Sequence, residues 1–408
     1  MTTPTILLDV TRTVARSRLP APTGIDRVER AYIDWALSLN AYFLVAIDRR
    51  QHLVGAETLS RLLDWQDRPD VPLPMDARSL MSPGRDRKLR QAQSLIRREA
   101  IATAGRPAQI TAMLRGTIEG RAVYINAGHD NLGENLMAAL DAAGIPKLVL
   151  IHDVIPLDHP EFTRRRVPAQ FAEKLQAAAL ADAILTNSAH TAERMCRYIA
   201  PQRLLIAPLG VEVAPPRPPS EDAAPYFLCL GTIEPRKNHQ LLMDLWEGFG
   251  PDAAPAELWI AGRRGWENKD LFKRLDTSAV IGRGVLELGP VTAAELHDLL
   301  SGARAVLFPS LAEGYGLPLA EALAMGIPVI ASDLPALREV GGSVPEYLSP
   351  TEAQTWSDRI TAYAAPGSPE RAAQLDRIAG WTAPTWKTHF DIVLNAIETV
   401  MAQSMAAG

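Results

Sequence analysis

Short apolar runs alternate with stretches of helical length along the 408 residues of the chain. Strands of a parallel sheet are buried on both faces, so they appear in a sequence as continuous apolar runs, and a crossover must separate two of them. The alternation predicts an α/β fold whose parallel sheets carry helices on both faces. We expect strands at 6–10, 42–47, 122–126, 147–152, 183–187 and 204–207, then at 226–231, 257–261, 285–288, 305–308 and 328–331.

A proline-rich segment at 213–225 separates the two sets of strands and is predicted to be an interdomain linker. We therefore expect two doubly wound, Rossmann-like domains that face a cleft. The first covers 1–212, with a helical, basic insertion at about 67–120, and the second covers 226–384. Residues 385–408 follow Pro384 and are predicted to form an amphipathic helix.

Glu313 and Glu321 stand eight residues apart where a predicted strand turns through glycines into a helix. Gly314 and Gly316 allow a tight turn and a close approach to a ligand. The free N–H groups of a helix start bind anions, so a phosphate is expected above Gly316 and Leu317, with the carboxylates on hydroxyl groups beside it. Alone, two glutamates at this spacing usually form a solvated helix face. In open α/β sheets, however, ligands bind at the carboxyl ends of strands, where this segment falls.

Two adjacent cations, Arg236 and Lys237, follow the strand predicted at 226–231. The chain has no Asp-x-Asp pair of the kind that holds a divalent cation on a diphosphate. If the chain binds a diphosphate and no metal neutralises it, the protein must supply the positive charge, and these two side chains are the expected source. The alternative is a solvated basic turn before the next helix.

The segment 308–326 resembles the Glu-x7-Glu signature of retaining glycosyltransferases with the GT-B fold, family 4 in particular. Segments 231–239, 260–266 and 286–291 are similar to the family's diphosphate-binding segment, second strand-loop and base-binding strand end, in the family's order. The chain departs from many members at Thr232, where they carry an arginine. This variant recurs among mannosyl- and rhamnosyltransferases of surface-polysaccharide biosynthesis.

The resemblance implies a role for each motif residue. Glu321 would bind the ribose hydroxyls and Glu313 the transferred sugar, while Arg236 and Lys237 would bind the diphosphate. The remaining donor-binding positions that it implies are Thr232, Val291, Gly316 and Leu317. It also implies that the last helix crosses back to the N-terminal domain.

His152 ends the strand predicted at 147–152 and is expected to point into the cleft. The resemblance places there a histidine that contacts the donor sugar, and orienting that sugar is the role we favour. A structural histidine and a general base are alternatives. A metal site built from His152, Asp153, Asp158 and His159 is the weakest, because the spacing matches no known ligand pattern.

Gly24 lies in a loop that opens the first predicted helix, and the resemblance brings this loop to the diphosphate and the acceptor. Asp26 and Arg27 would then belong to the site, although Asp26 could simply complement the helix dipole. Position alone suggests four further cleft residues, of which the last could instead cap a helix: Asn126, His129, Asn187 and Ser188.

Composition narrows the class of protein. A net charge of −5 argues against nucleic-acid binding. Cys196 and Cys229 are predicted to be two buried free thiols in a reducing compartment. The N-terminal residues lack the basic and then apolar pattern of a signal peptide, and no apolar run reaches the ~20 residues of a membrane span. A cytoplasmic location is therefore expected.

Residues 85–106 carry seven Lys or Arg against Asp86 and Glu99. Two interpretations stay open for this segment. It is either a solvated helix face or a surface that attracts anionic head groups at the inner face of the plasma membrane, with 164–166 as an extension.

The sequence thus predicts a metal-independent, retaining glycosyltransferase without a cofactor. It would move a hexose from a nucleotide diphosphate sugar, GDP-mannose on subfamily resemblance, to a glycan or a polyprenyl-diphosphate-linked or other lipid-linked acceptor in surface-polysaccharide biosynthesis. Two alternatives remain: a nucleotide-sugar epimerase on the same fold and a non-catalytic glycan-binding scaffold.

Overall fold

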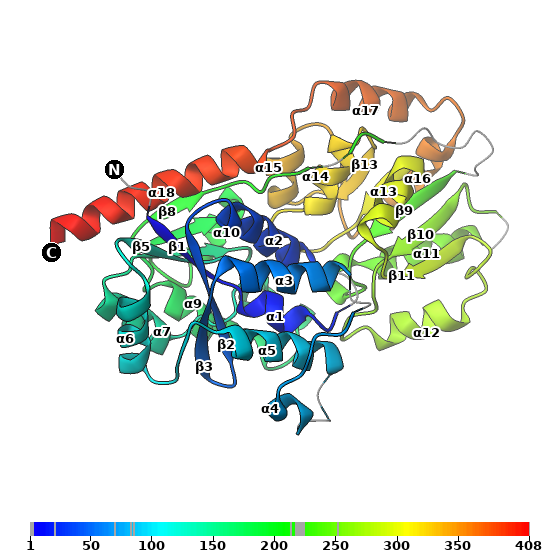
Figure 1. Ribbon diagram of the computed structural model, residues 1–408. Helices are drawn as coiled ribbons and strands as arrows, with labels where there is room; N and C mark the ends of the chain where they lie inside the picture. Colours follow the sequence, from blue (N-terminus) through cyan, green and yellow to red (C-terminus); the bar gives the residue numbers. More distant parts are fainter. Residues whose placement is uncertain are drawn as a thin grey trace.

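The computed structural model describes residues 4–19, 22–68, 71–81, 84, 86–212, 214–216, 225–250 and 253–407. It shows two α/β domains, each built on its own sheet (Figure 1). Most of the predicted linker, namely residue 213 and residues 217–224, lies outside the described residues.

The first sheet has eight strands in the order β4-β3-β2-β1-β5-β6-β7-β8. Its bounds are β1 (Thr5–Asp9), β2 (Ala41–Ile47), β3 (Arg50–Val54), β4 (Ala102–Ala104), β5 (Ala122–Asn126), β6 (Lys147–Ile151), β7 (Ala183–Thr186) and β8 (Leu204–Ile206). The six strands from β2 to β8 pair in parallel, as predicted. The strands β3 and β4 were not predicted, and they extend one edge in antiparallel pairing.

The helices of this part cover both faces of the sheet (Figure 1). They are α1 (Thr11–Arg16), α2 (Gly24–Leu37), α3 (Ala56–Asp67), α4 (Ala77–Leu80), α5 (Arg87–Glu99), α6 (Pro107–Thr117), α7 (Glu134–Ala143), α8 (Ile155–Asp158), η1 (Pro160–Phe162), α9 (Val167–Ala178) and α10 (Ala189–Met195). The region predicted to be a helical insertion at 67–120 contains α4, α5 and α6, but it also contributes the edge strand β4. The helix that Gly24 begins is the second, because the short α1 precedes it.

The second sheet has six strands, all parallel, in the order β11-β10-β9-β12-β13-β14. Its bounds are β9 (Tyr226–Leu230), β10 (Glu257–Ala261), β11 (Val285–Gly289), β12 (Ala305–Phe308), β13 (Val329–Ser332) and β14 (Glu346–Leu348). The helices are η2 (Pro235–Lys237), α11 (His239–Phe249), α12 (Lys269–Thr277), α13 (Ala293–Gly302), α14 (Leu317–Ala324), α15 (Pro335–Gly341), α16 (Ala353–Ala364) and α17 (Pro369–Ala379). The parallel strands at the centre of the first sheet and the fully parallel second sheet confirm the predicted pair of Rossmann-like domains.

The last helix, α18 (Trp386–Ala407), follows the second domain in sequence but packs on the first (Figure 1). Its apolar side chains join the core on one face of the first sheet, where Val393 and Ala396 are fully buried with Ile6 and Leu8 of β1. The amphipathic helix therefore buries its apolar stripe against the first domain, which ties the two ends of the chain together.

Cys229 is buried on β9, as predicted, whereas Cys196 is exposed at the end of α10, so the prediction of two buried thiols is wrong for Cys196. Of the helices in the described part of the chain, none is both long and apolar enough to cross a membrane.

Candidate active site

Loops that follow the carboxyl ends of strands in both sheets meet at the junction of the two domains. At Gly314, which follows β12, a Cβ atom would lie 2.4 Å from the carbonyl oxygen of His152 and 2.7 Å from Cβ of Asp153, both of which follow β6. Only glycine fits at such distances. From the sequence we expected Gly314 to allow a ligand close to the backbone, but in the structure it allows the backbone of the first domain to pack there.

The turn from β12 into α14 has the predicted form. Gly316 has φ 95°, which side-chain-bearing residues rarely adopt, and a Cβ atom there would lie 2.4 Å from Cδ2 of Leu337. Leu317 begins α14, Pro318 follows it in the first turn, and the side chain of Leu317 packs against the core of the first domain. The backbone N–H groups at this helix start therefore lie at the domain junction. Anion binding there stays a prediction.

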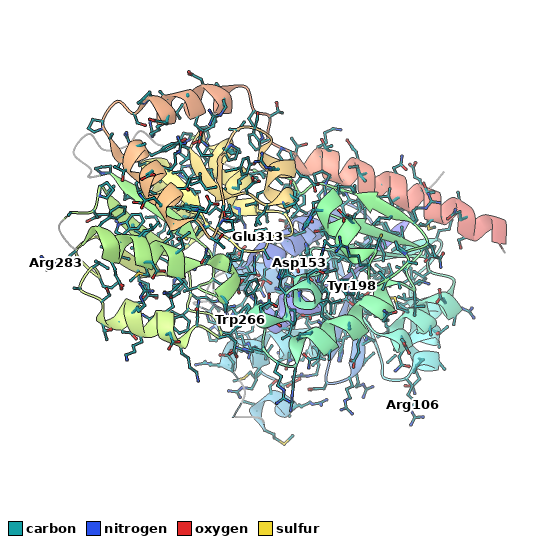
Figure 2. All side chains as sticks on the ribbon, turned by 180° about the vertical axis from the view of Figure 1, so that it is seen from behind. Arg106, Asp153, Tyr198, Trp266, Arg283 and Glu313 are labelled. Carbon is teal, nitrogen blue, oxygen red and sulfur yellow. The ribbon has the colours of Figure 1, made fainter. Side chains whose placement is uncertain are left out.

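Glu313 is buried among cations at the centre of this junction (Figure 2). Nζ of Lys237 lies 2.5 Å from its Oε1, and Nη1 of Arg236 lies 3.0 Å from its Oε2. The hydroxyl of Ser310 also donates to Oε1 at 2.7 Å. Burial alone would raise the pKa of Glu313, but Lys237 and Arg236 outweigh it and lower the pKa to about 2. The carboxylate is therefore ionised at neutral pH.

The short η2 turn aims both cations at Glu313. Asn238 ends this turn in the left-handed conformation, with φ 53°. Lys237 also lies over the ring of Phe308, 4.6 Å from its centroid. Arg236 contacts a second carboxylate, because its Nε lies 2.6 Å from Oε1 of Glu234. The two cations are thus directed into the junction, and the alternative of a solvated basic turn is wrong for them.

Asp153 faces this cluster from the first domain, and Figure 2 shows it between the domains beside Glu313. Burial raises the pKa of Asp153, although the nearby charge of Arg236 opposes that shift. The sequence considered Asp153 only as a metal ligand. Its position directly after a strand, beside His152, is the signal that could have identified it.

Arg27 and Glu321 form an ion pair across the two domains. Glu321 is 4% exposed and lies on α14, while Arg27 lies on α2. The side chain predicted to hold ribose hydroxyls is therefore paired with a guanidinium of the opposite domain. Gly24, at the start of α2, approaches the same region, since a Cβ atom there would lie 3.7 Å from Cδ1 of Leu317.

The carboxylate of Asp26 stabilises the start of α2. It accepts from the backbone N–H of Thr23 at 2.7 Å, and Nε of Arg12 lies 2.7 Å from it. These bonds place Asp26 at the helix start, where the alternative from the sequence expected it to complement the dipole, whereas Arg27 reaches the second domain.

His152 is buried rather than directed into an open cleft, with 4% of its surface exposed. Its Nε2 lies 2.7 Å from the carbonyl oxygen of Ala127, and its ring packs beside that of His129, with the centroids 4.8 Å apart. Burial lowers the pKa of His152 to about 4, so the ring is neutral at physiological pH. A neutral imidazole can orient a ligand by hydrogen bonding, but it does not supply positive charge.

The other first-domain candidates organise the junction. Asn126 holds its own loop by accepting from the backbone N–H of His129 at 3.0 Å. Asn187 donates to the carbonyl oxygen of His152 at 2.9 Å. Ser188 caps α10 by accepting from the N–H of Thr191 at 3.0 Å, as one interpretation predicted. It also donates to the carbonyl oxygen of Gly314 at 2.7 Å, so it joins the two domains as well.

The predicted donor-binding positions Thr232 and Val291 follow β9 and β11 at the same edge of the second sheet. Thr232 packs against Gly265, where a Cβ atom would lie 2.7 Å from the threonine methyl group. Val291 packs against the core on one face of the sheet.

In the part of the chain that the structure describes, no group of three or more His, Cys, Asp or Glu side chains is arranged to hold a metal ion. Asp158, one member of the metal site considered from the sequence, is instead bonded to Nε of Arg194 at 2.6 Å and to the hydroxyl of Tyr198 at 2.7 Å.

Two parallel-sheet Rossmann-like domains, with charged side chains gathered between their strand ends, define the GT-B class of glycosyltransferase folds. Residues 212–368 match the family model described as "Glycosyl transferases group 1". The similarity to this family therefore lies in the second domain, whose strands β9 to β14 all fall within these residues.

Mannosyltransferases are among the proteins that resemble this chain in sequence. The serotype-specific mannosyltransferase WbdA of Escherichia coli is 29% identical over 234 residues, which are 52% of this chain and 29% of WbdA. The O-antigen chain mannosyltransferase B of Escherichia coli is 33% identical over 136 residues, 33% of this chain and 35% of that protein. The match thus spans about a third or less of the length of these relatives.

The fold is shared over nearly the whole chain. Anabaena HepE, solved in complex with UDP and glucose, superposes with a TM-score of 0.64 over 98% of this chain and 100% of its own, at 17% identity. Sucrose-phosphate synthase from Thermosynechococcus elongatus gives a TM-score of 0.58 over 100% of both chains, at 14% identity.

Proposed function

We propose that this protein is a retaining hexosyltransferase that uses a nucleotide diphosphate sugar, with GDP-mannose as the donor, and extends a surface glycan. The observation that carries the proposal is the contact of Arg236 and Lys237 with the buried carboxylate of Glu313 at the domain junction. The mannosyltransferase relatives support the choice of sugar.

The cations would stabilise the leaving group. A nucleoside diphosphate gains negative charge as the bond to the sugar breaks, and preorganised positive charge in a water-poor site favours that transition state. Arg236 and Lys237 are held in place before the donor arrives, because Glu313 and Glu234 already orient them. This arrangement supports a reaction in which the protein, not a divalent cation, neutralises the diphosphate.

Retention of configuration needs no separate general base. On the same face of the sugar, an oxygen of the departing phosphate can accept the proton of the acceptor hydroxyl. The neutral ring of His152 and the ionised carboxylate of Glu313 would then orient the sugar hydroxyls. Glu321 would hold the ribose, once its ion pair with Arg27 opens.

A lipid-linked acceptor would bring the enzyme to the inner face of the plasma membrane, and one surface suits that contact. Three large apolar side chains in the segment 71–81, which contains α4, are 60–77% exposed: Val71, Leu80 and Met81. The helix α4 packs on α5 through a 2.8 Å hydrogen bond between Ser94 and Ser79. Exposed cations lie on α5, the helix on which α4 packs: Arg87, Lys88 and Arg98. Apolar side chains beside cations favour an anionic bilayer surface.

This surface differs from the one expected from the sequence, where all the cations of residues 85–106 were candidates for membrane contact. Arg97 is only 11% exposed, and its Nε lies 2.6 Å from Oδ2 of Asp76. It stabilises the contact of α4 with α5 and is not available to lipid. Arg85 lies outside the described residues.

The proposal is tested by incubating the protein with GDP-mannose and with UDP- and dTDP-linked hexoses, with and without an α-mannoside acceptor. We expect nucleoside diphosphate release and a longer glycan only when acceptor is present, with the anomeric configuration of the donor retained in the product by NMR. Conversion of the donor to another nucleotide sugar without acceptor would instead identify an epimerase. Binding of glycan without turnover of any donor would indicate a scaffold.

A further inference from the structure

A cavity of about 830 Å³ opens beside the candidate active site, between α1, α2, α3 and the start of α18. Its volume falls within the range of about 300–1,000 Å³ that is typical of small-molecule sites. Arg27, which pairs with Glu321 of the second domain, forms part of its lining. So does Thr292, the residue after Val291. The cavity therefore adjoins the proposed donor site but is built mainly by the first domain.

Three aromatic rings form one wall of the cavity. Trp35 of α2 stacks on Phe390 of α18 with ring centroids 4.7 Å apart and an interplanar angle of 5°. Trp386 also stacks on Phe390, with ring centroids 5.7 Å apart and an interplanar angle of 26°. Trp35 and Trp386 are both partly exposed. Flat, partly exposed rings of this kind offer a surface against which the C–H face of a pyranose ring can pack.

Charged groups surround this wall, and their charges balance. The cations that line the cavity are Arg16, Arg27, Arg30 and Lys88. The carboxylates that line it are Asp26, Asp34, Asp67 and Glu212. Several are already paired, since Arg30 lies 3.0 Å from Asp34 and 3.3 Å from Asp67. Paired charges present fixed hydrogen-bond donors and acceptors without a net field, which suits hydroxyl groups better than a phosphate.

A buried donor points to a polar ligand as well. Trp65 of α3 lines the cavity and is 6% exposed, and its indole N–H has no hydrogen-bond partner among the described residues. Buried N–H groups without a partner are rare in folded proteins. Because the nitrogen itself is buried, a ligand hydroxyl would pair with this N–H only after a shift of the Trp65 ring.

We propose that this cavity binds an uncharged sugar residue of the acceptor glycan, with its ring against Trp35 and Trp386 and its hydroxyls on Asp34 and Asp67. The proposal rests on the proposed glycosyl transfer, because the cavity would hold the acceptor next to the donor. It assigns acceptor recognition to the sugar part of the acceptor and not to a diphosphate.

The test is calorimetric titration of the whole protein with methyl α-mannoside, mannobiose and mannotriose, and separately with inorganic diphosphate. We expect the sugars to bind and the diphosphate not to compete with them. Asp67→Ala should weaken sugar binding roughly tenfold, the usual effect of losing a hydrogen bond to a charged group. Asp64→Ala is the matched control, because Asp64 is an exposed aspartate of the same helix that does not line the cavity.

Asp34→Ala provides a second variant if Asp67→Ala lowers the thermal stability of the protein. Equal sugar affinity in both cavity variants and the Asp64→Ala control would overturn the proposal, as would binding of diphosphate but of no sugar. Titration of the same samples with GDP separates the two proposals. Sugar binding without any nucleotide binding contradicts the transferase but not the cavity, whereas nucleotide binding without any sugar binding contradicts only the cavity.

Discussion

Nζ of Lys237 lies 2.5 Å from Oε1 of Glu313, although 76 residues separate the two in sequence. Each follows a strand of the second sheet, β9 for Lys237 and β12 for Glu313, and these strands are neighbours. Because both side chains are largely buried, removing Glu313 takes the carboxylate away from Lys237, and removing Lys237 leaves Arg236 and Ser310 to hold Glu313 in a site of low polarity. The contributions of Lys237 and Glu313 to turnover and stability are therefore coupled.

Lys237→Ala should lower kcat by roughly 10²–10³, the typical loss for a preorganised group that stabilises transition-state charge. The KM for the donor should change less, because the contact strengthens as the diphosphate departs. Steady-state kinetics with saturating acceptor measures both constants. Lys269→Ala, at an exposed lysine of α12, is the control. A rise in KM at unchanged kcat would show that Lys237 binds ground state and transition state equally.

Glu313→Gln should change how stability depends on acidity. The pKa of Glu313 is lowered from 4.5 to about 2, so the ionised carboxylate stabilises the folded state fully above pH 4.5. That stabilisation is lost as the pH falls from 4.5 through 2, and it is on the order of 3 kcal/mol. Urea unfolding of the wild type and Glu313→Gln should therefore differ most near neutral pH and converge in acid. A difference that is independent of pH would contradict this prediction, and exposed Glu173→Gln serves as the control.

The strands were predicted well where burial on both faces makes a continuous apolar run, as in β9, β12 and β13. The missed strands, β3, β4 and β14, lie toward the sheet edges and are short or polar, so they leave no such run. The link between Arg236, Lys237 and Glu313 could be foreseen because all three follow strands of one sheet.

The contacts between domains could not be foreseen in the same way. The interaction of Asp153 with Arg236 and the ion pair of Arg27 with Glu321 depend on how the first domain packs against the second. The periodicity of apolar residues does not encode that packing. The same holds for Gly314, whose missing side chain accommodates the backbone of His152.

Chelation should leave turnover intact, because Arg236 and Lys237 are proposed to neutralise the diphosphate without a divalent cation. The measurement is the rate of nucleoside diphosphate release before and after treatment with excess EDTA. Activity that disappears in EDTA and returns with manganese would show that a metal ion takes part.

Leu80→Glu and Met81→Glu should each weaken co-sedimentation with liposomes that contain anionic lipid. Both variants replace an exposed apolar side chain with a negative charge, which the anionic lipid repels. Leu180→Glu is the matched control, since Leu180 is also exposed, at 45%, but lies after α9, away from α4. Equal binding by all three variants would refute the membrane contact at α4.

The ion pair between Arg27 and Glu321 leads to a contrast between two variants. If Glu321 holds the ribose, Glu321→Ala leaves two hydroxyls without an acceptor and should cost about 1–3 kcal/mol in affinity for the bare nucleoside diphosphate. Arg27→Ala should instead raise the affinity for the nucleoside diphosphate, because it removes the guanidinium that the ribose must displace from Glu321. Calorimetry with GDP and UDP on both variants measures the two effects. Unchanged affinity in Glu321→Ala, or an equal loss in both variants, would place the ribose elsewhere and leave the pair as a contact that only holds the domains together.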